Sequence, residues 1–341
     1  MRYIVVTALF LISSHLLIAQ TGIIAAPEIY GNRSVPTDQI LFALGMREGD
    51  TLYDRNADLK ELEKRVRQVQ GIKQVSLNSV CCNKNGKLLL YVGIGETDSV
   101  KQYRSQPVQH INLPAEMMKS YNDFLTHLDS AVRKGQNGEY DSLPYSLVKY
   151  TPVRNEQMKF IKFANQQFEA LDNVLKNAAD DDQRAAAAQI IAYGDDKKKV
   201  VKALLYAIDD PNDVVRNNAI RALGILVGYN NIYPRSGINI PADPFIEMLN
   251  SLEWTDRNKA SILLFQLTEN RDKVILDKLN KMAYSSLLEM AKWKDRGHAL
   301  FPFLILGRIA GIPDELLFEQ NFSEGYEKKL DEITSKIAVS S

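Results

Sequence analysis

Residues 204–224, LLYAIDDPNDVVRNNAIRALG, decide the fold because they hold a complete copy of a pattern that the C-terminal half repeats. Asp210-Pro211 ends one helix and turns the chain, and an arginine, an alanine and a large apolar residue follow at positions 216, 219 and 223. An acidic residue comes shortly before the arginine in every copy. The repeated arginines are 32, 41 and 39 residues apart: Arg184, Arg216, Arg257 and Arg296. This period indicates a solenoid of helix pairs, in which neighbouring pairs must stack to bury their apolar faces.

These copies resemble the HEAT repeat family over residues 160–315. The second copy is nearly complete, and the others keep the arginine and the alanine but lose Asp-Pro: Arg184 with Ala187, Arg257 with Ala260, and Arg296 with Ala299. The resemblance implies an outer and an inner helix packed antiparallel in each repeat. We expect each arginine to be buried, to pair with the acidic residue before it and to brace the turn. We predict an all-α, HEAT-like solenoid over residues 156–335, with an insertion at 228–244.

Length and composition are those of an ordinary globular protein. The 341 residues suffice for two domains with separate cores, and 45% of them are hydrophobic and 25% charged. Lys plus Arg and Asp plus Glu number 42 each, so the overall charge gives no reason to expect a nucleic acid partner.

The first residues have the pattern of a secretory signal peptide. Arg2 supplies a positive start, and residues 3–18 form an almost unbroken apolar run without charge. We predict a signal peptide at 1–19, cleaved between Ala19 and Gln20; cleavage near Ala26 and an uncleaved anchor helix are the alternatives. Because no later segment is apolar enough to cross a bilayer, the mature chain is expected not to span a membrane. The predicted location is periplasmic or secreted, including a peripheral position at the outer membrane.

The next segment predicts a small α+β domain at residues 23–97, with the element order β-α-α-β-β. A short strand at 28–30 precedes a helix that starts near Pro36 and ends before Gly45. A second helix at about 56–69 has apolar residues on one face. Strands at 75–80 and 88–94 flank the tight-turn dipeptide Asn85-Gly86.

This domain resembles the POTRA module of outer-membrane assembly and two-partner secretion proteins. The resemblance is carried by Ile29-Tyr-Gly31-Asn32, by Gly49-Asp50-Thr-Leu52-Tyr53, by the step Gly71-Ile72-Lys-Gln-Val75 and by the last strand ending in Glu96. It implies a module that binds client polypeptide, often by adding an extended segment to a sheet edge. One departure is that no barrel pattern follows residue 97.

Residues 98–155 read as a linker with one helix. Pro, Gly, Ser and Asn are scattered among aromatic residues there, and one stretch at about 114–133 is apolar at helical intervals. We expect that apolar stripe to pack on the solenoid. The three tyrosines at 140, 145 and 150 form no pattern that we can interpret.

No set of residues predicts catalysis, a cofactor or a metal. His110, His127 and His298 lie in different contexts without ligand spacing, and nucleophile, phosphate-loop, dinucleotide and zinc motifs are absent. The acidic runs at 180–182 and 195–196 precede or join helices, where carboxylates favour the positive end of the helix dipole. We therefore predict no catalytic, cofactor-binding or metal residues, and a protein that is not an enzyme.

Cys81 and Cys82 are the only cysteines and are adjacent, so they cannot staple distant parts of the chain. The sequence leaves three states open: an eight-membered disulfide ring, a bridge to a partner, and reduced thiols at a strand end. The pair lacks the spacing of a CxxC redox site.

Together these features predict a multidomain protein in which a POTRA-like α+β domain precedes a HEAT-like α-solenoid. The leading hypothesis is a protein-binding scaffold or adaptor in envelope protein assembly or secretion, with outer-membrane or secretion components as partners. In it, the sheet edge takes an extended segment and the concave solenoid face holds a folded partner. The alternatives are an accessory protein that cradles the substrate of an envelope enzyme, and a purely structural envelope protein.

Overall fold

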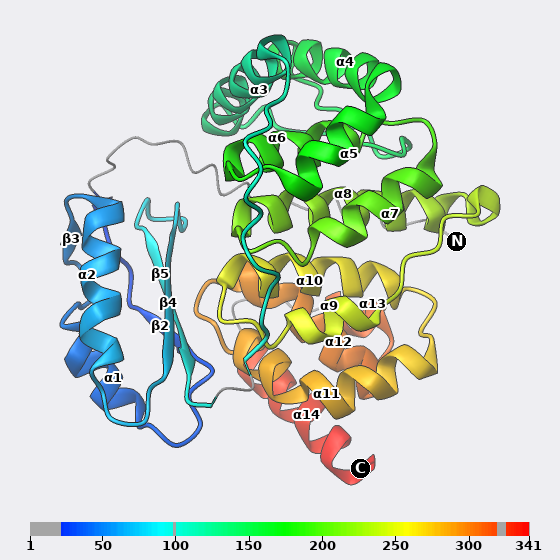
Figure 1. Cartoon of the computed structure of the whole chain (residues 1–341). Coiled ribbons are helices and arrows are strands. Elements are labelled where there is room, and N and C mark those ends of the chain that lie inside the picture. Colours follow the sequence, from blue (N-terminus) through cyan, green and yellow to red (C-terminus); the bar gives the residue numbers. More distant parts are fainter. Residues whose placement is uncertain (1–21, 98–99, 319–324, 341) are drawn as a thin grey trace. The chain divides into compact units, whose positions relative to one another are not determined.

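The computed structural model describes residues 22–97, 100–318 and 325–340, which form two compact units (Figure 1). Unit 1 is made by residues 102–241. Of the described residues, unit 2 combines those from 22 to 101 with those after 241. The predicted signal peptide and its cleavage point lie outside the described residues. No helix of the described ranges combines the length and the apolarity that crossing a membrane requires.

The N-terminal part of unit 2 has the predicted order β-α-α-β-β, with two additional short strands. A three-stranded sheet has the order β2-β5-β4, in which β5 is parallel to β2 and antiparallel to β4. Strands β1 and β3 form a separate ladder. The elements are β1 Gly22–Ile23, β2 Glu28–Tyr30, α1 Thr37–Leu44, β3 Thr51–Leu52, α2 Arg55–Arg67, β4 Gln74–Val80 and β5 Leu89–Gly95.

Alternation along β5 gives the sheet two different faces. Leu90, Val92 and Ile94 enter a hydrophobic core that α1 and α2 complete. Tyr91 and Gly93 therefore point to the opposite face, and that face packs against helices of the same unit. Helix α1 ends where predicted, since Gly45 has a φ of 63° in the left-handed region that glycine tolerates.

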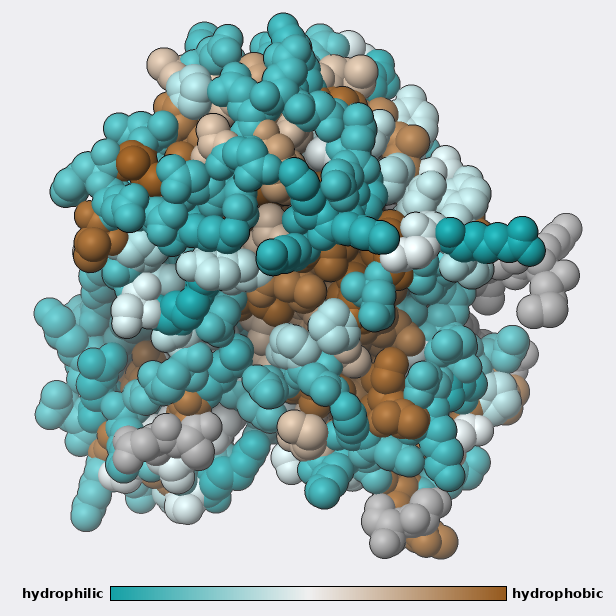
Figure 2. Space-filling model, turned by 45° about the vertical axis from the view of Figure 1, so that its right-hand side comes forward, coloured by the Kyte–Doolittle hydropathy of each residue, from teal (hydrophilic) through white to brown (hydrophobic). Residues whose placement is uncertain are grey.

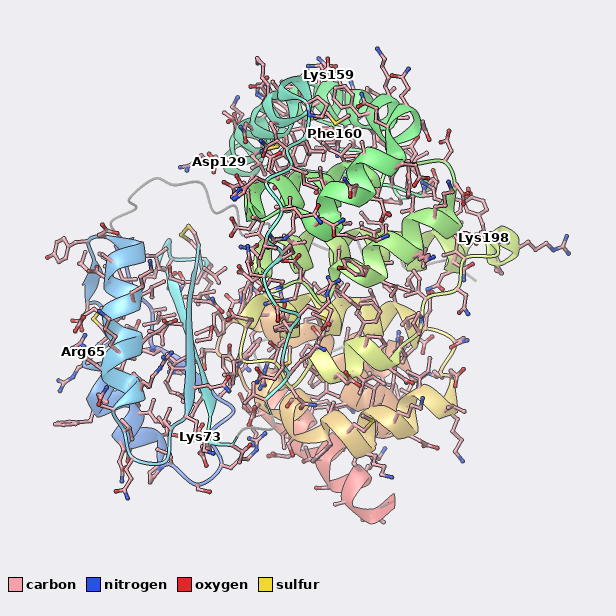
Figure 3. All side chains as sticks on the ribbon, in the orientation of Figure 1. Arg65, Lys73, Asp129, Lys159, Phe160 and Lys198 are labelled. Atoms are coloured by element: carbon pink, nitrogen blue, oxygen red, sulfur yellow. A yellow bond between two sulfur atoms is a disulfide. The ribbon has the colours of Figure 1, made fainter. Side chains whose placement is uncertain are left out.

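Apart from connecting segments and two isolated β-bridges, the rest of the described chain is helical. In unit 1 they are α3 Ala115–Arg133, α4 Thr151–Gln166, α5 Phe168–Asn177, α6 Asp181–Ile191, α7 Lys197–Ala207, α8 Asp213–Ile232 and the 3-10 turn η1 Pro234–Ser236. In unit 2 they are α9 Asp243–Met248, α10 Trp254–Leu267, α11 Lys273–Ala291, α12 Arg296–Ile309, α13 Asp314–Phe318 and α14 Tyr326–Ser340. Figure 3 shows that one side of α4 is buried and the other exposed: Phe160 points into the interior, whereas its neighbour Lys159 lies at the surface.

The repeated arginines all lie at the start of the second helix of a pair: α6, α8, α10 and α12. In each unit the two second helices pack against each other. Three of the guanidinium groups donate to the carbonyl six residues earlier, Arg184 to Ala178, Arg216 to Asp210 and Arg257 to Ser251. These three arginines are buried, so the expectation that they brace the turns is confirmed for them. The expected burial is wrong for Arg296, which is only half-buried and pairs with Glu327.

The expected pairing of Arg184 with the acidic residue before it is wrong. Nε and Nη2 of Arg184 bind the carboxylate of Asp210, at 2.8 and 3.0 Å, in the turn of the following repeat. Both side chains are fully buried. Asp180, just before α6, instead caps the helix: its side chain accepts hydrogen bonds from the backbone N–H groups of Asp182 and Gln183. The ion pair therefore joins two repeats.

The predicted insertion at 228–244 begins too early. Helix α8 continues to Ile232, where the backbone N–H of Tyr233 still donates to the carbonyl of Tyr229. The rings of Tyr229 and Tyr233 lie 4.7 Å apart, a contact between residues one helical turn apart that stabilises this last turn. The exposed loop therefore occupies only residues 233–242, where the chain passes from unit 1 to unit 2.

Leu223 of α8 is fully buried and tests the repeat register. We expect Leu223→Ala to lower the free energy of unfolding by about 2–5 kcal/mol, since it removes packed atoms and leaves a cavity. Urea unfolding followed by circular dichroism measures the loss. Lys202→Ala, at an exposed position of α7, is the matched control. A loss below about 0.5 kcal/mol for Leu223→Ala would show that the register is wrong.

Candidate binding surface

The acidic runs begin helices, as the sequence suggested. Asp180 accepts hydrogen bonds from two backbone N–H groups at the start of α6, and Asp196 does the same at the start of α7. Within the described ranges no group of three or more His, Cys, Asp or Glu side chains could hold a metal ion. His110 is exposed, whereas His298 is buried in unit 2.

The adjacent cysteines form a disulfide with each other in the structure. They follow the end of β4, and Cys82 packs against the hydrophobic core between the sheet and α1 and α2. Of the three states that the sequence left open, the structure therefore contains the eight-membered ring.

The edge of the sheet was predicted to take an extended client segment. Its longer edge strand, β4, is flanked by α2, and the backbone N–H of Leu77 donates to Oε1 of Glu63 at 3.0 Å. A carboxylate on the middle amide of an edge strand is one way of protecting that edge from another strand. The other edge strand, β2, has only three residues. The edge is therefore a poor candidate for the main binding surface.

Aromatic rings fill the second face of the sheet, between β5 and the helices α10 and α12. The ring of Tyr91 lies 5.2 Å from Trp254, 5.0 Å from Trp293 and 5.7 Å from His298. Tyr30 of β2 contacts Trp293 at 5.8 Å and donates its hydroxyl to the carbonyl of Leu252. Such pairs stabilise beyond their buried area. This aromatic cluster fastens the sheet to α10 and α12.

Gly93 shows how closely the two layers approach. A Cβ atom at this position would lie 2.2 Å from the carbonyl oxygen of Leu252 and 3.0 Å from the ring of Tyr30. No dinucleotide-binding motif surrounds Gly93 in the sequence. Its role is steric, because only glycine allows this strand to approach the turn before α10.

Two buried polar groups of the aromatic cluster depend on each other. The Tyr91 hydroxyl and Nδ1 of His298 lie 2.6 Å apart. Burial raises the pKa of Tyr91 well above its usual value and lowers the pKa of His298 to about 4, with Asp295 opposing the latter shift. The hydroxyl therefore donates the hydrogen bond to a neutral imidazole. With one face in the core and the other in this cluster, the sheet has no free face for a partner.

The corresponding face of unit 1 has a different cover. Helix α3 packs against α4 and α6 (Figure 1), as its apolar stripe predicted. Its Tyr121 hydroxyl accepts a hydrogen bond from Asn218 of α8. Beside α3 lies the flap, residues 138–149, which connects α3 to α4. The flap is a short hairpin in which Glu139 pairs with Val148 in an antiparallel bridge. It covers parts of α4, α6 and α8.

Polar groups hold the flap in place. Gln157 of α4 accepts the N–H of Val148 at 2.8 Å and donates to the carbonyl of Ser146 at 3.2 Å. Its amide group also donates to the Tyr193 hydroxyl. Arg221 of α8 forms an ion pair with Glu139. The face of unit 1 thus holds the backbone of the flap by a side-chain amide and its Glu139 side chain by a guanidinium.

A small cleft, with a volume of about 10 Å³ while the flap is in place, lies between the flap and the helices α6 and α8. On the helix side it is lined by the half-buried or buried residues Gln189, Asn218, Arg221, Ala222 and Ile225. Tyr145 and Ser146 line it from the flap. Amides, a guanidinium and an aromatic ring suit the binding of polypeptide. This cleft and the flap site form the candidate binding surface.

A second extended segment follows the turns of unit 1. This strap, residues 102–113, is part of the cyan trace in Figure 1. Arg104 donates from Nη2 to the carbonyl of Tyr206 at 2.7 Å, and its guanidinium carbon lies 3.3 Å from the centre of the Tyr206 ring. Further along, Gln109 exchanges backbone hydrogen bonds with Asn177 and Ala179. The strap is therefore bound structure within unit 1.

The sequence reading missed Gln157, Gln189 and Arg221, although one signal was available. Gln189 and Arg221 both lie five residues after a repeated arginine. In the two later copies the same position holds Ile262 and Phe301. A polar residue at a buried repeat position, where other copies are apolar, would have marked this face of unit 1.

Comparison with known proteins identifies one part of the chain. Residues 168–236 match the HEAT repeat family. This stretch runs from α5 to η1 and includes the repeat with Asp210-Pro211 and Arg216. No curated protein matches the chain.

Solved structures with some similarity include two designed armadillo repeat proteins. The first is 15% identical with a TM-score of 0.36, and the second, in complex with the peptide (KR)4, is 14% identical with a TM-score of 0.35. Each alignment covers 55% of this chain and 94% of the designed protein.

The surface of the chain is mainly hydrophilic on the face drawn in Figure 2, with hydrophobic residues in limited areas.

His298 makes the stability of unit 2 depend on pH. Because its folded pKa is about 4 and its ordinary value is 6.5, unfolding takes up a proton between these values. Stability is therefore complete above pH 6.5 and falls as the pH drops towards 4, by on the order of 3 kcal/mol. We expect His298→Gln to remove this loss, as measured by urea unfolding at pH 7 and pH 4.5. His110→Gln, at an exposed site, should retain it; an unchanged loss in His298→Gln would contradict the assignment.

Proposed function

We propose that this chain is a non-enzymatic scaffold that binds protein segments outside the cytoplasm, in envelope protein assembly or secretion. A helical repeat with the HEAT signature is consistent with a protein-binding scaffold. The observation that carries the proposal is the double contact of Gln157 with Ser146 and Val148, which shows how this face accommodates extended polypeptide.

The envelope setting rests on the N-terminal sequence. The charge at Arg2 and the apolar run at 3–18 support export, and the likeness of residues 23–97 to POTRA modules supports a place among assembly or secretion proteins. The sheet of this module is fastened to α10 and α12, so we assign partner binding to unit 1. The module in unit 2 then serves as a fixed part of the scaffold.

The proposal assigns no catalytic role because the most suggestive side chains already have structural partners. Arg184 is held by Asp210, Arg257 by Ser251 and Glu289, and Asp180 and Asp196 cap helices. Groups engaged in this way maintain turns and helix ends.

A site-specific photo-crosslinker in the full chain tests partner binding. Placed at residue 222, inside the cleft, it should capture envelope assembly or secretion proteins in living cells. The same group at residue 202, on the exposed side of α7, is the control and should capture them far less. Capture of no partner from position 222, or equal capture at both positions, would contradict a binding role for this face.

Export is tested separately with residues 1–30 fused to a reporter enzyme that is active only outside the cytoplasm. We expect an active reporter, and an inactive one after Leu11→Arg, because a charge in the apolar run blocks export. An inactive fusion with the natural sequence would rule out the envelope setting and leave the scaffold role to be judged by crosslinking.

A further inference from the structure

The flap occupies the candidate binding surface in the manner of a bound peptide. We propose that this face of unit 1 binds an acidic, tyrosine-containing segment of a partner protein that forms a hairpin like the flap, and that residues 138–149 hold the site as an internal competitor. This inference rests on the proposed function and gives the chemical class of the partner.

Gln157 binds the backbone of the flap. The carbonyl of residue 146 and the N–H of residue 148 point to the same side of an extended chain, and Gln157 binds both with its one amide group. Every extended polypeptide presents the same pair of atoms at this spacing. The contact therefore recognises an extended conformation and does not require the sequence of the flap.

The site also binds a negative charge of the flap. The Arg221 side chain is almost fully buried, and its guanidinium binds the Glu139 carboxylate and, at 3.3 Å, Oγ of Ser146. A guanidinium in such a position favours a carboxylate partner strongly over a neutral one. Any segment that replaces the flap must bring an acidic residue to this point.

The flap also places the aromatic ring of Tyr145 in the site. The Tyr145 ring lies 5.5 Å from the ring of Tyr193 and 5.2 Å from Nζ of Lys197. Lys197 is partly buried and also donates to the carbonyl of Gly194, so its charge stays near the ring. A tyrosine fits because its half-buried ring can face both groups.

The flap has the features of a segment that can leave. It is a connection between two helices, and it follows Gly135, which has a φ of 65°. Among its residues only Ser146 and Val148 are buried. As part of the same chain it competes at an effective concentration on the order of 1 mM, so a partner segment must bind tightly or find the flap open.

Peptide binding to an opened chain tests the inference. In the opened chain, residues 139–148 are replaced by Gly and Ser in equal number. The probe is a fluorescent peptide with the natural sequence 138–149, GEYDSLPYSLVK. We expect saturable binding by fluorescence anisotropy with a Kd of about 1–100 μM, and binding at least about ten-fold weaker to the natural chain, whose flap competes.

Matched variants separate specific recognition from general stickiness. Arg221→Ala in the opened chain, and a probe with Lys in place of its glutamate, should each weaken binding at least about ten-fold, because each removes the charge pair. Lys202→Ala should leave binding unchanged.

Three results would overturn the inference: no saturation at about 1 mM probe with an opened chain that is folded by circular dichroism, equal affinity of the natural and opened chains, or no effect of Arg221→Ala. If the opened chain does not fold, the pair Glu139→Gln and Tyr145→Ala in the natural chain replaces it under the same criteria. Partner capture at position 222 without peptide binding would leave the proposed function standing and reject this inference alone.

Discussion

The constraint on which the structure depends is that a pair of helices cannot bury both of its layers by itself. Neighbouring pairs bury one another along the stack, but the outer side of the second helices still needs a cover. In each unit, this chain supplies that cover from its own sequence. The two covers differ in chemistry, and this difference separates a permanent part of the fold from a candidate binding surface.

In unit 2 the cover is a sheet, and its contact is aromatic and tightly fitted. Tyr30 and Tyr91 pack among two tryptophans and a neutral histidine, and Gly93 allows the backbones to meet. In unit 1 the cover is α3 together with the flap, which is held by Gln157 and Arg221. Apolar burial scales with area and is lost only when the layers separate, whereas polar contacts can be exchanged for those of another peptide. Unit 1 is therefore the better place for a partner.

Local features of the fold could be predicted from the sequence because local physics decides them. Gly45 ends α1, the alternation of 75–80 gives a strand, and the repeated arginines mark the second helices. Contacts between residues far apart in the sequence could not be predicted from it. The Tyr30 hydroxyl donates to the carbonyl of Leu252, 222 residues away. Arg184 binds Asp210 of the next repeat rather than the acidic residue nearby. No periodicity within one segment encodes those choices. The repeat position of Arg221 was a local signal for the candidate site, but its assembly could not be predicted for the same reason, since Gln157, Arg221 and Tyr145 come together only after folding.

The central claim is that the flap of unit 1 opens while the sheet that covers unit 2 stays in place. Hydrogen exchange of the full chain under native conditions tests it directly, by comparing the amide of Val148, which donates to Gln157, with the amides of β5. The account requires Val148 to exchange through a local opening that denaturant hardly affects, and the β5 amides to exchange only with the unfolding of unit 2. Protection of Val148 equal to that of β5, with the same denaturant dependence, would contradict it.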